Sequence, residues 1–310
     1  MFRDIVSNEE AKTFLQNELK MKKSSGTYLF NGKRGSNPME FALAYAKALL
    51  CTDEEYDFCD ECSSCRRINS GNYPDVHIYG RDNTIKIDEV REIIYKASSS
   101  SFEGDKRVFI LDNIENLRKE AANALLKTIE EPERGTFFIL LSNTLNIIPT
   151  ILSRSILVNI AKKNMEELGV TREEYDFFFG NTSEIEEYRE KVLDIKNPES
   201  YREIGVFLKE YKEDKELDVK IKVYKALRDF IGNRALIEDM DKIYFAQEIA
   251  RGLSKTKEFD KTREVAEEMM YYSMLLSKNT KGMERLIELK GYNKFNVNLG
   301  LLLKVFFLEI

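Results

Sequence analysis

All four cysteines of the chain lie in one short segment, at Cys51, Cys59, Cys62 and Cys65. Four thiolates match the tetrahedral coordination of zinc, and a C-x2-C step lets two sulfurs converge on one ion from a tight turn. Such a set leaves no open position for water, so we expect a structural Zn2+ and no hydrolysis at the metal. The alternatives are an iron–sulfur cluster, disulfides or plain buried cysteines. The single histidine, His77, is expected to be an ordinary strand residue.

A second stretch has the place, but not the residues, of a phosphate-binding loop. It runs Gly32-Lys-Arg-Gly-Ser-Asn-Pro-Met39, after an apolar run and before a helical pattern. A working loop, G-x-x-x-x-G-K-[ST], cradles phosphates with backbone N–H groups, neutralises them with its lysine and binds magnesium through its hydroxyl. Gly32 and Gly35 are present, but Asn37, Pro38 and Met39 replace the second Gly, the Lys and the Ser or Thr. The segment therefore predicts a degenerate nucleotide site, although taken alone an ordinary strand-to-helix turn fits as well.

A later strand pattern carries the other half of the same chemistry. The apolar run 108–111 is followed by Asp112 and Asn113. An acid at the end of such a strand is the position from which a Walker B aspartate holds magnesium. Asn113 stands where a glutamate would orient the attacking water, so we expect water activation to be lost. Ser142-Asn143 ends a further strand where a nucleotide sensor would stand, and we expect it to be structural.

Short apolar runs alternate with helical patterns up to about residue 160. Runs such as Val108-Phe-Ile-Leu are apolar without alternation, as expected of strands buried on both faces. Strand, helix, strand is typical of a parallel sheet with helices on both faces. The predicted strands are 27–31, 76–79, 107–112 and 136–142, and the predicted helices are 40–50, 88–97 and 118–130.

For the helix that follows Asp112, the pattern predicts capping by Asn113 or Asn116. One apolar face is expected to pack against the sheet, because its residues recur at helical spacing. That face comprises Leu117, Ala121, Ala124, Leu125 and Ile129.

The C-terminal part differs in composition, since no proline follows Pro198 and apolar residues recur at helical spacing. This pattern favours helix packing without a sheet. The predicted organisation is an α/β domain over 1–160 with a zinc-binding insert at 51–65, a helical lid over 161–202 and a helical domain over 203–310. The helices of the last domain are expected within 204–211, 219–231, 244–253, 264–277 and 299–309.

The composition excludes several classes of protein. The 310 residues, 43% hydrophobic and 33% charged, suffice for two or three folded domains and exclude disorder or low complexity. No apolar stretch approaches the ~20 residues of a membrane-spanning helix, and the N-terminus lacks the pattern of a signal peptide. We therefore expect no membrane contact and a cytoplasmic location. The net charge of −6 argues against bulk electrostatic coating of nucleic acid but leaves a local basic patch open.

Together, these stretches resemble the clamp-loader branch of the AAA+ ATPases, and within it the delta-prime family of bacterial DNA polymerase III subunits. The matching segments come in the family's order and spacing over roughly residues 5–160. The resemblance implies an AAA+ domain with a RecA-like parallel sheet, a lid and a C-terminal collar that holds an assembly together. The matching segments are Tyr28-Leu-Phe-Asn-Gly-Lys-Arg-Gly, the four-cysteine insert, Tyr73-Pro-Asp-Val-His, Ile87-Asp-Glu-Val-Arg, Asn123-Ala-Leu-Leu-Lys-Thr-Ile-Glu-Glu-Pro and Ile151-Leu-Ser-Arg-Ser.

The same branch includes the gamma/tau ATPase, which shares the cysteine insert and most of these motifs. Gamma/tau keeps the Lys and Ser/Thr of its phosphate loop and delta-prime members commonly do not, so the resemblance implies a subunit without ATP hydrolysis of its own. A Ser-Arg-Cys element of the family inserts its arginine toward ATP bound by the adjacent subunit. Here it reads Ser153-Arg154-Ser155, so Arg154 is expected to be an arginine finger acting in trans, with Ser153 in the same motif. The alternative for a lone arginine is a solvated surface charge.

The resemblance also implies partners. These are gamma/tau and delta subunits in an open ring of the polymerase holoenzyme, the sliding clamp indirectly, and primed DNA within the assembly. Two other functions stay open. An ATPase of the gamma/tau kind would need Lys33 or Arg34 to supply the missing charge, although both lie early in the loop. A zinc-stabilised adaptor in DNA repair would keep the fold but leave replication.

Overall fold

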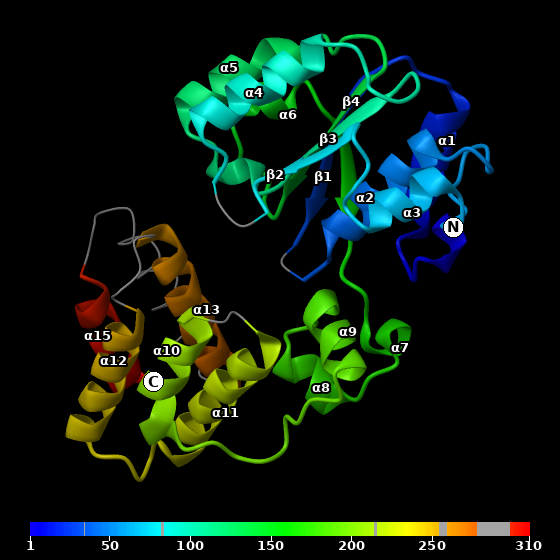
Figure 1. Cartoon of the computed structure of the whole chain (residues 1–310). Coiled ribbons are helices and arrows are strands. Elements are labelled where there is room, and N and C mark those ends of the chain that lie inside the picture. Colours follow the sequence, from blue (N-terminus) through cyan, green and yellow to red (C-terminus); the bar gives the residue numbers. More distant parts are fainter. Residues whose placement is uncertain (34, 82–83, 214–215, 254–258, 278–297) are drawn as a thin grey trace. The chain divides into compact units, whose positions relative to one another are not determined.

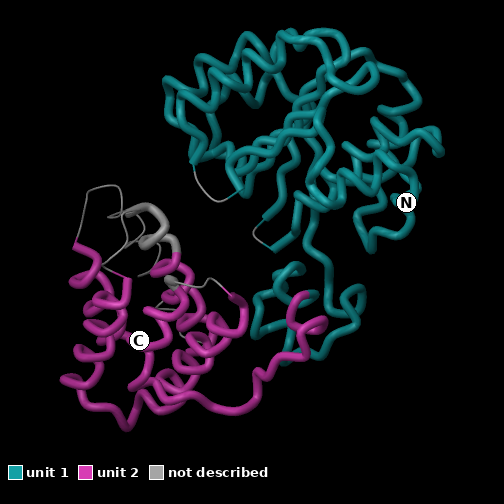
Figure 2. Tube along the Cα trace, viewed as in Figure 1, with its two compact units in different colours: residues 1–186 teal, residues 187–310 magenta. Residues whose placement is uncertain are grey.

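The computed structural model describes residues 1–33, 35–81, 84–213, 216–253, 259–277 and 298–310. The chain forms two compact units, Met1–Glu186 and Glu187–Ile310 (Figure 2). The boundary falls inside helix α9 (Thr182–Glu190), so most of the segment expected to form a lid belongs to the same unit as the sheet. The division into three domains stays a prediction.

Unit 1, Met1–Glu186, is built on a five-stranded sheet in the order β2-β3-β4-β1-β5. Every pair of neighbouring strands is parallel, which confirms the parallel α/β fold predicted from the apolar runs. β1 lies between β4 and β5, with Tyr28 opposite Ile139 on one side and Ile156 on the other. The strands are β1 (Gly26–Gly32), β2 (Val76–Tyr79), β3 (Arg107–Leu111), β4 (Thr136–Ser142) and β5 (Ile156–Ile160).

The edge strand β5 is absent from the predicted elements. Its five residues alternate in exposure, with Leu157 and Asn159 exposed and Val158 and Ile160 buried. This signal is weaker than the continuous apolar runs of β3 and β4, which are buried throughout.

Helices cover both faces of the sheet, because successive side chains of a strand point to opposite sides (Figure 1). The face that we call the α2 face packs Tyr28 and Phe30 against α1 (Glu9–Lys20), α2 (Pro38–Leu50) and α3 (Ser63–Asn69). The opposite face, which we call the α5 face, packs Leu29 against α4 (Ile87–Ser98), α5 (Lys119–Glu130) and α6 (Pro149–Leu152). Two separate hydrophobic clusters therefore hold the sheet.

The start of α5 differs from its prediction. The residue before the helix is Arg118, which makes no capping hydrogen bond, so capping by Asn113 or Asn116 was wrong. Asn113 is instead left-handed, with φ 53°, and precedes a short 3-10 helix, Ile114–Asn116. Of the expected apolar face, Ala124 is exposed, whereas Leu117, Ala121, Leu125 and Ile129 are buried as predicted.

The described residues of unit 2 form helices and no strand, which confirms the helical C-terminal region. Their core is aromatic: the rings of Phe230 and Phe245 stack at 3.9 Å, and Phe307 meets both edge-on. No helix among the described residues is long and apolar enough to cross a membrane. The elements after α9 are the 3-10 helix Tyr201–Glu203, α10 (Ile204–Glu213), α11 (Leu217–Asn233), α12 (Asp239–Leu253), α13 (Phe259–Ser277) and α15 (Leu299–Glu309).

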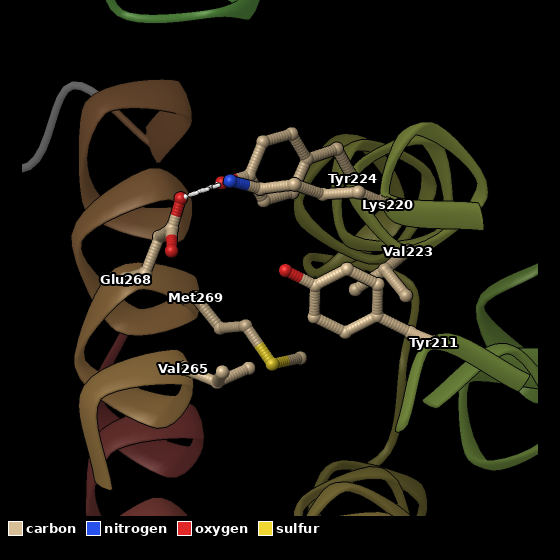
Figure 3. A pocket seen from close by; sticks show the side chains of 7 residues that line it. All are labelled: Tyr211, Lys220, Val223, Tyr224, Val265, Glu268 and Met269. Carbon is tan, nitrogen blue, oxygen red and sulfur yellow. Dashed lines mark hydrogen bonds and ion pairs between the residues drawn. The ribbon is translucent and has the colours of Figure 1, made fainter. Parts of the chain in front are cut away.

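An ion pair joins α11 to α13 inside unit 2 (Figure 3). Lys220 Nζ lies 2.7 Å from Glu268 Oε1, and the two side chains are only 12% and 13% exposed. The hydroxyl of Tyr224 donates to the same carboxylate. The adjoining cavity of about 10 Å³, between these residues and Met269, is too small for any ligand larger than water. We therefore interpret this place as packing between helices.

Candidate functional site

The four cysteines converge as their spacing predicts. Cys51 follows the last residue of α2, Cys62 is the N-cap of α3 and Cys65 lies within α3. All four sulfurs lie within 4.8 Å of one another, and Cys51 Sγ is 3.7 Å from Cys59 Sγ. A tetrahedral ion with ~2.3 Å metal–sulfur bonds separates its sulfurs by about 3.8 Å, whereas a disulfide needs ~2.05 Å. The cluster therefore fits a metal ion, and none of the four cysteines forms a disulfide in the described chain.

Backbone groups favour the ionised form of one of these thiols. Burial opposes ionisation of Cys62, but hydrogen bonds involving Thr52 and Cys65 outweigh it and lower its pKa to about 6. The N–H of Cys65 donates to Cys62 Sγ, and the N–H of Cys62 donates to Cys59 Sγ. His77 is a residue of β2, where its ring lies 5.0 Å from that of Phe109, and it is not among the clustered ligands.

The cysteine cluster is fastened to α2. Lys47 of α2 pairs with Asp60, and its ammonium lies 4.2 Å from the centre of the Phe58 ring. Phe58 also meets Phe2 edge-on, with ring centres 5.4 Å apart. A metal at the cluster would therefore brace the helix that starts at the predicted phosphate loop.

Within the described part of the predicted phosphate loop, side chains of the loop itself take up the space inside it. Ser36 is 1% exposed, and a Cβ at Gly32 would lie only 2.1 Å from its Oγ. Asn37 adopts a left-handed conformation with φ 53°, Pro38 begins α2, and Met39 packs against the core. Pro38 also removes one backbone N–H that could face a phosphate.

The segment after β5 packs against the loop. The carbonyl of Gly35 accepts the N–H of Thr182, at 3.1 Å. Gly35 has φ +89°, and a Cβ there would lie 2.9 Å from the Cα of Asn181, so only glycine fits without movement. The hydroxyls of Ser36 and Thr182 are buried, and neither has a hydrogen-bond partner among the residues that the structure describes. Close packing here has therefore left two polar groups uncompensated.

A buried lysine ties the same elements together. Lys163 has a side chain only 4% exposed, and its Nζ lies 3.1 Å from Glu40 Oε2 and 3.2 Å from Glu186 Oε1. Glu40 lies in the first turn of α2, and Glu186 belongs to α9. The helix start and α9 are thus joined by an internal cation.

The predicted Walker B acid lies at the end of β3. Burial raises the pKa of Asp112 to about 6, and Glu115 adds to the effect. Asp112 Oδ1 accepts the N–H of Asn113, whose Nδ2 donates to the carbonyl of Gly80. A Cβ at Gly80 would lie 2.3 Å from the Asp112 carbonyl oxygen, so this close approach requires glycine.

One residue of this edge is missing from the sequence analysis. Glu115 accepts from Ser142 Oγ at 2.9 Å and from Asn143 Nδ2 at 3.3 Å. Both side chains of the predicted sensor position, Ser142 and Asn143, therefore donate hydrogen bonds to the Glu115 carboxylate. A carboxylate close to Asp112 in sequence was the available signal, but its pairing with β4 depends on the sheet order.

Arg154 lies just after α6, with a side chain 30% exposed. Its Nε is enclosed and lies 2.7 Å from Glu130 Oε2, as an ion pair without the geometry of a hydrogen bond. Its Nη1 donates to the carbonyl of Thr150, which also accepts from Ser153 Oγ. Ser155 Oγ donates to the carbonyl of Ile151. Arg154 is thus held at the surface of the α5 face by residues of α5 and α6.

Comparison with known proteins places the chain. The model of a family described as "DNA polymerase III, delta subunit" matches residues 7–164, just over half of the chain. The chain belongs to this family. The family membership confirms the resemblance indicated by the motifs. The structure separately confirms the predicted parallel sheet and the helical C-terminal part.

Two similar proteins of Bacillus subtilis belong to different subunit types. DNA polymerase III subunit delta' is 33% identical over 142 residues, which cover 45% of this chain and 43% of that protein. DNA polymerase III subunit tau is 38% identical over 155 residues, which cover 49% of this chain and 28% of that protein. The chain thus spans less than half the length of these two relatives.

A solved structure extends the likeness of fold to both units. A DNA polymerase III gamma subunit-related protein of Thermotoga maritima aligns with a TM-score of 0.51. The alignment covers 96% of this chain and 99% of that protein, at 18% sequence identity. The family member described here therefore shares an overall fold with that protein.

Proposed function

We propose that this chain is a non-hydrolysing, delta-prime type subunit of a DNA polymerase III clamp loader. It would assist the ATP-dependent loading of the sliding clamp on primed DNA. The observation that carries the proposal is the filled phosphate loop, in which Gly35 and Ser36 contact the chain's own residues. Phosphate binding needs free N–H groups, a lysine and a magnesium ligand, and Pro38 and Met39 supply neither the charge nor the ligand.

Arg154 supports a role for the chain at a neighbour's ATP. It lies at the surface, in the Ser153-Arg154-Ser155 element, and the planar guanidinium suits a γ-phosphate that gains charge during transfer. Trans-acting arginines accelerate GTP hydrolysis by ~10³- to 10⁵-fold in other systems. We propose that Arg154 performs this task in the assembly, with Ser153 fixing the local turn.

The cysteine cluster supports structural Zn2+. The sulfurs are close enough to share one ion, whereas the thiolates of an iron–sulfur cluster bind separate irons of a larger group. Zinc held by four thiolates has no open position, so it would stabilise the fold and supply no catalysis. Cys51, Cys59, Cys62 and Cys65 would hold it.

Unit 2 would supply the assembly contacts. In this proposal residues 203–310 form a collar that joins gamma/tau and delta subunits in the cytoplasm, and residues 161–202 form the lid. The chain would act largely as a stator, while ATP-driven rearrangement occurs in its neighbours. DNA would be met inside the assembly, which is compatible with the net charge of −6.

An ATPase of the gamma/tau kind is the second candidate. The 38% identity to the Bacillus subtilis tau subunit favours it. It would need a cation in the loop. Lys33 is exposed, and Arg34 lies outside the described residues. The argument against both is their position in the sequence, because they come earlier in the loop than the lysine of a working phosphate loop.

ATP binding and turnover by the chain alone separate the two candidates. We expect no saturable binding at millimolar ATP and no hydrolysis. Turnover that disappears in Asp112→Ala would contradict the proposal and favour the gamma/tau type. Copurification with gamma/tau and delta subunits tests the assembly, because a DNA-repair adaptor would fail to copurify with them.

A further inference from the structure

We propose that Glu130 is a positioning residue for Arg154, one that orients the guanidinium before a neighbouring subunit docks. The inference rests on the proposed arginine-finger role. It assigns a task to the motif Asn123–Pro132, which the rest of the proposed function leaves without one.

The contacts that support it involve two of the three guanidinium nitrogens. Glu130 Oε2 lies 2.7 Å from Arg154 Nε, and the carbonyl of Thr150 accepts from Nη1 at 3.2 Å. Within the described part of the chain, Nη2 makes no hydrogen bond. The guanidinium is therefore held from one side, with one nitrogen left for an external acceptor.

Both ends of this contact sit on rigid backbone. Ile129, next to Glu130, is 1% exposed, and its carbonyl accepts from the buried hydroxyl of Thr27 in β1, at 2.7 Å. Ile151 of α6 is fully buried. The hydrogen bond to β1 and the burial of α6 fix the two backbones, so the side-chain contact defines where the guanidinium lies.

Holding the guanidinium in advance reduces the cost of docking. A free arginine side chain loses rotamer entropy when it is ordered against a phosphate. The Glu130 and Arg154 side chains are 49% and 30% exposed, so the pair contributes little to folding stability. Its effect should therefore fall on catalysis in the assembly and barely on the melting temperature of the chain.

A double-mutant cycle in the assembled clamp loader tests the proposal. The chain carries Glu130→Gln, Arg154→Ala or both, and is combined with gamma/tau and delta subunits, clamp and primed DNA. We expect Glu130→Gln to lower kcat for ATP about three- to tenfold with KM for ATP unchanged, and to change nothing further when Arg154 is already alanine. The matched control is Glu131→Gln, which alters an exposed neighbouring glutamate and should leave turnover unchanged.

The outcomes are distinct. Unchanged or faster turnover in Glu130→Gln overturns the inference, as does an equal loss with and without Arg154. If Arg154→Ala itself has no effect, the arginine-finger proposal fails and the inference fails with it. If only the Glu130 effect is missing, the arginine-finger proposal stands.

A second measurement needs no partner subunits. The Nε–H resonance of Arg154 in the full chain should exchange slowly with water and lie apart from those of exposed arginines. In Glu130→Gln, or in Glu130→Asp if the first variant fails to fold, it should exchange faster and move toward them. An unchanged resonance would overturn the inference whatever the assembly shows.

Discussion

The two faces of the sheet use their polar residues differently. On the α2 face, Lys163 is buried between two glutamates and Ser36 fills the loop, so these groups contact the chain itself. On the α5 face, Arg154 stays at the surface, held by Glu130 and Thr150. A nucleotide site must keep groups free for its ligand, and the first face does not. Under the proposed function, the α2 face belongs to a nucleotide site that no longer works, and the α5 face carries the residue that would act on a neighbour's ATP.

Loss of the proposed metal should have the largest effect. The cysteine cluster supports α2 and α3, and structural zinc contributes directly to folding. We expect Cys65→Ser to lose the metal and to lower the free energy of unfolding by about 4 kcal/mol or more. Metal analysis and urea denaturation measure both quantities.

Hydrogen exchange can compare how the two faces of the sheet respond to removal of the metal. Amides of α2 and α3 should lose protection first on chelation, whereas those of α5 and α6 should keep more of theirs. Equal loss on both faces would show that the metal does not act through the α2 face.

Substitution of Gly35 should have the next largest effect. Gly35→Ala places a Cβ 2.9 Å from the Cα of Asn181 at a positive φ, so the contact between the loop and the residue before α9 must shift. We expect a loss of about 3 kcal/mol. Gly71→Ala is the matched control, because Gly71 also has a positive φ but a Cβ there would meet no atom of the described residues within 4 Å. It should lose about 1 kcal/mol. Equal losses in urea denaturation would mean that the packing against Asn181 does not matter.

The pKa of Asp112 gives a pH-dependent prediction. Its folded-state pKa of about 6 exceeds the ordinary 3.8, so the folded state binds the proton more tightly. The cost of the buried carboxylate is small below about pH 4, grows as the pH rises from about 4 to 6, and is fully present at pH 7. Asp112→Asn should therefore raise the free energy of unfolding by about 2 kcal/mol at pH 7.5 and by almost nothing at pH 4.

The control for this variant is Asp105→Asn, at an exposed position, which should show no such pH dependence. A destabilised Asp112→Asn at pH 7.5 would mean that the carboxylate is used in the folded protein, as in a working magnesium site.

The smallest effect is expected at Ser36. Its hydroxyl is buried and has no hydrogen-bond partner in the described part of the chain, so Ser36→Ala removes an uncompensated polar group. We expect a gain of about 1 kcal/mol in the free energy of unfolding, measured in urea. A loss of similar size would indicate that the hydroxyl has a partner, such as water or an anion, and that the loop still has room for one.

Local patterns predicted much of this molecule. The continuous apolar runs of β3 and β4 and the spacing of the cysteines were sufficient, because each depends on residues near in sequence. The edge strand β5 and the Glu115 contacts were not predictable, since they depend on which strands become neighbours. The capping prediction at Asn113 failed because α5 begins only at Lys119, and Asn113 instead precedes a short 3-10 helix.

The position of Arg154 in the sequence was identified, but its surroundings were not. Nothing in the local pattern connects residues 130 and 154, which meet only because α5 and α6 pack on the same face. The packing of Gly35 against Asn181 could not be predicted from the local sequence either, because it joins segments far apart in the chain.

ATP turnover by the reconstituted clamp loader tests the central claim most directly. The chain would be unaltered or carry Arg154→Ala, and assembly of both forms would be confirmed by size-exclusion chromatography. Our account predicts a fall in DNA- and clamp-stimulated turnover of about tenfold or more, and a similar fall in Arg154→Lys, which lacks the planar fork. Unchanged turnover in an intact assembly would contradict it and leave the chain a structural subunit only.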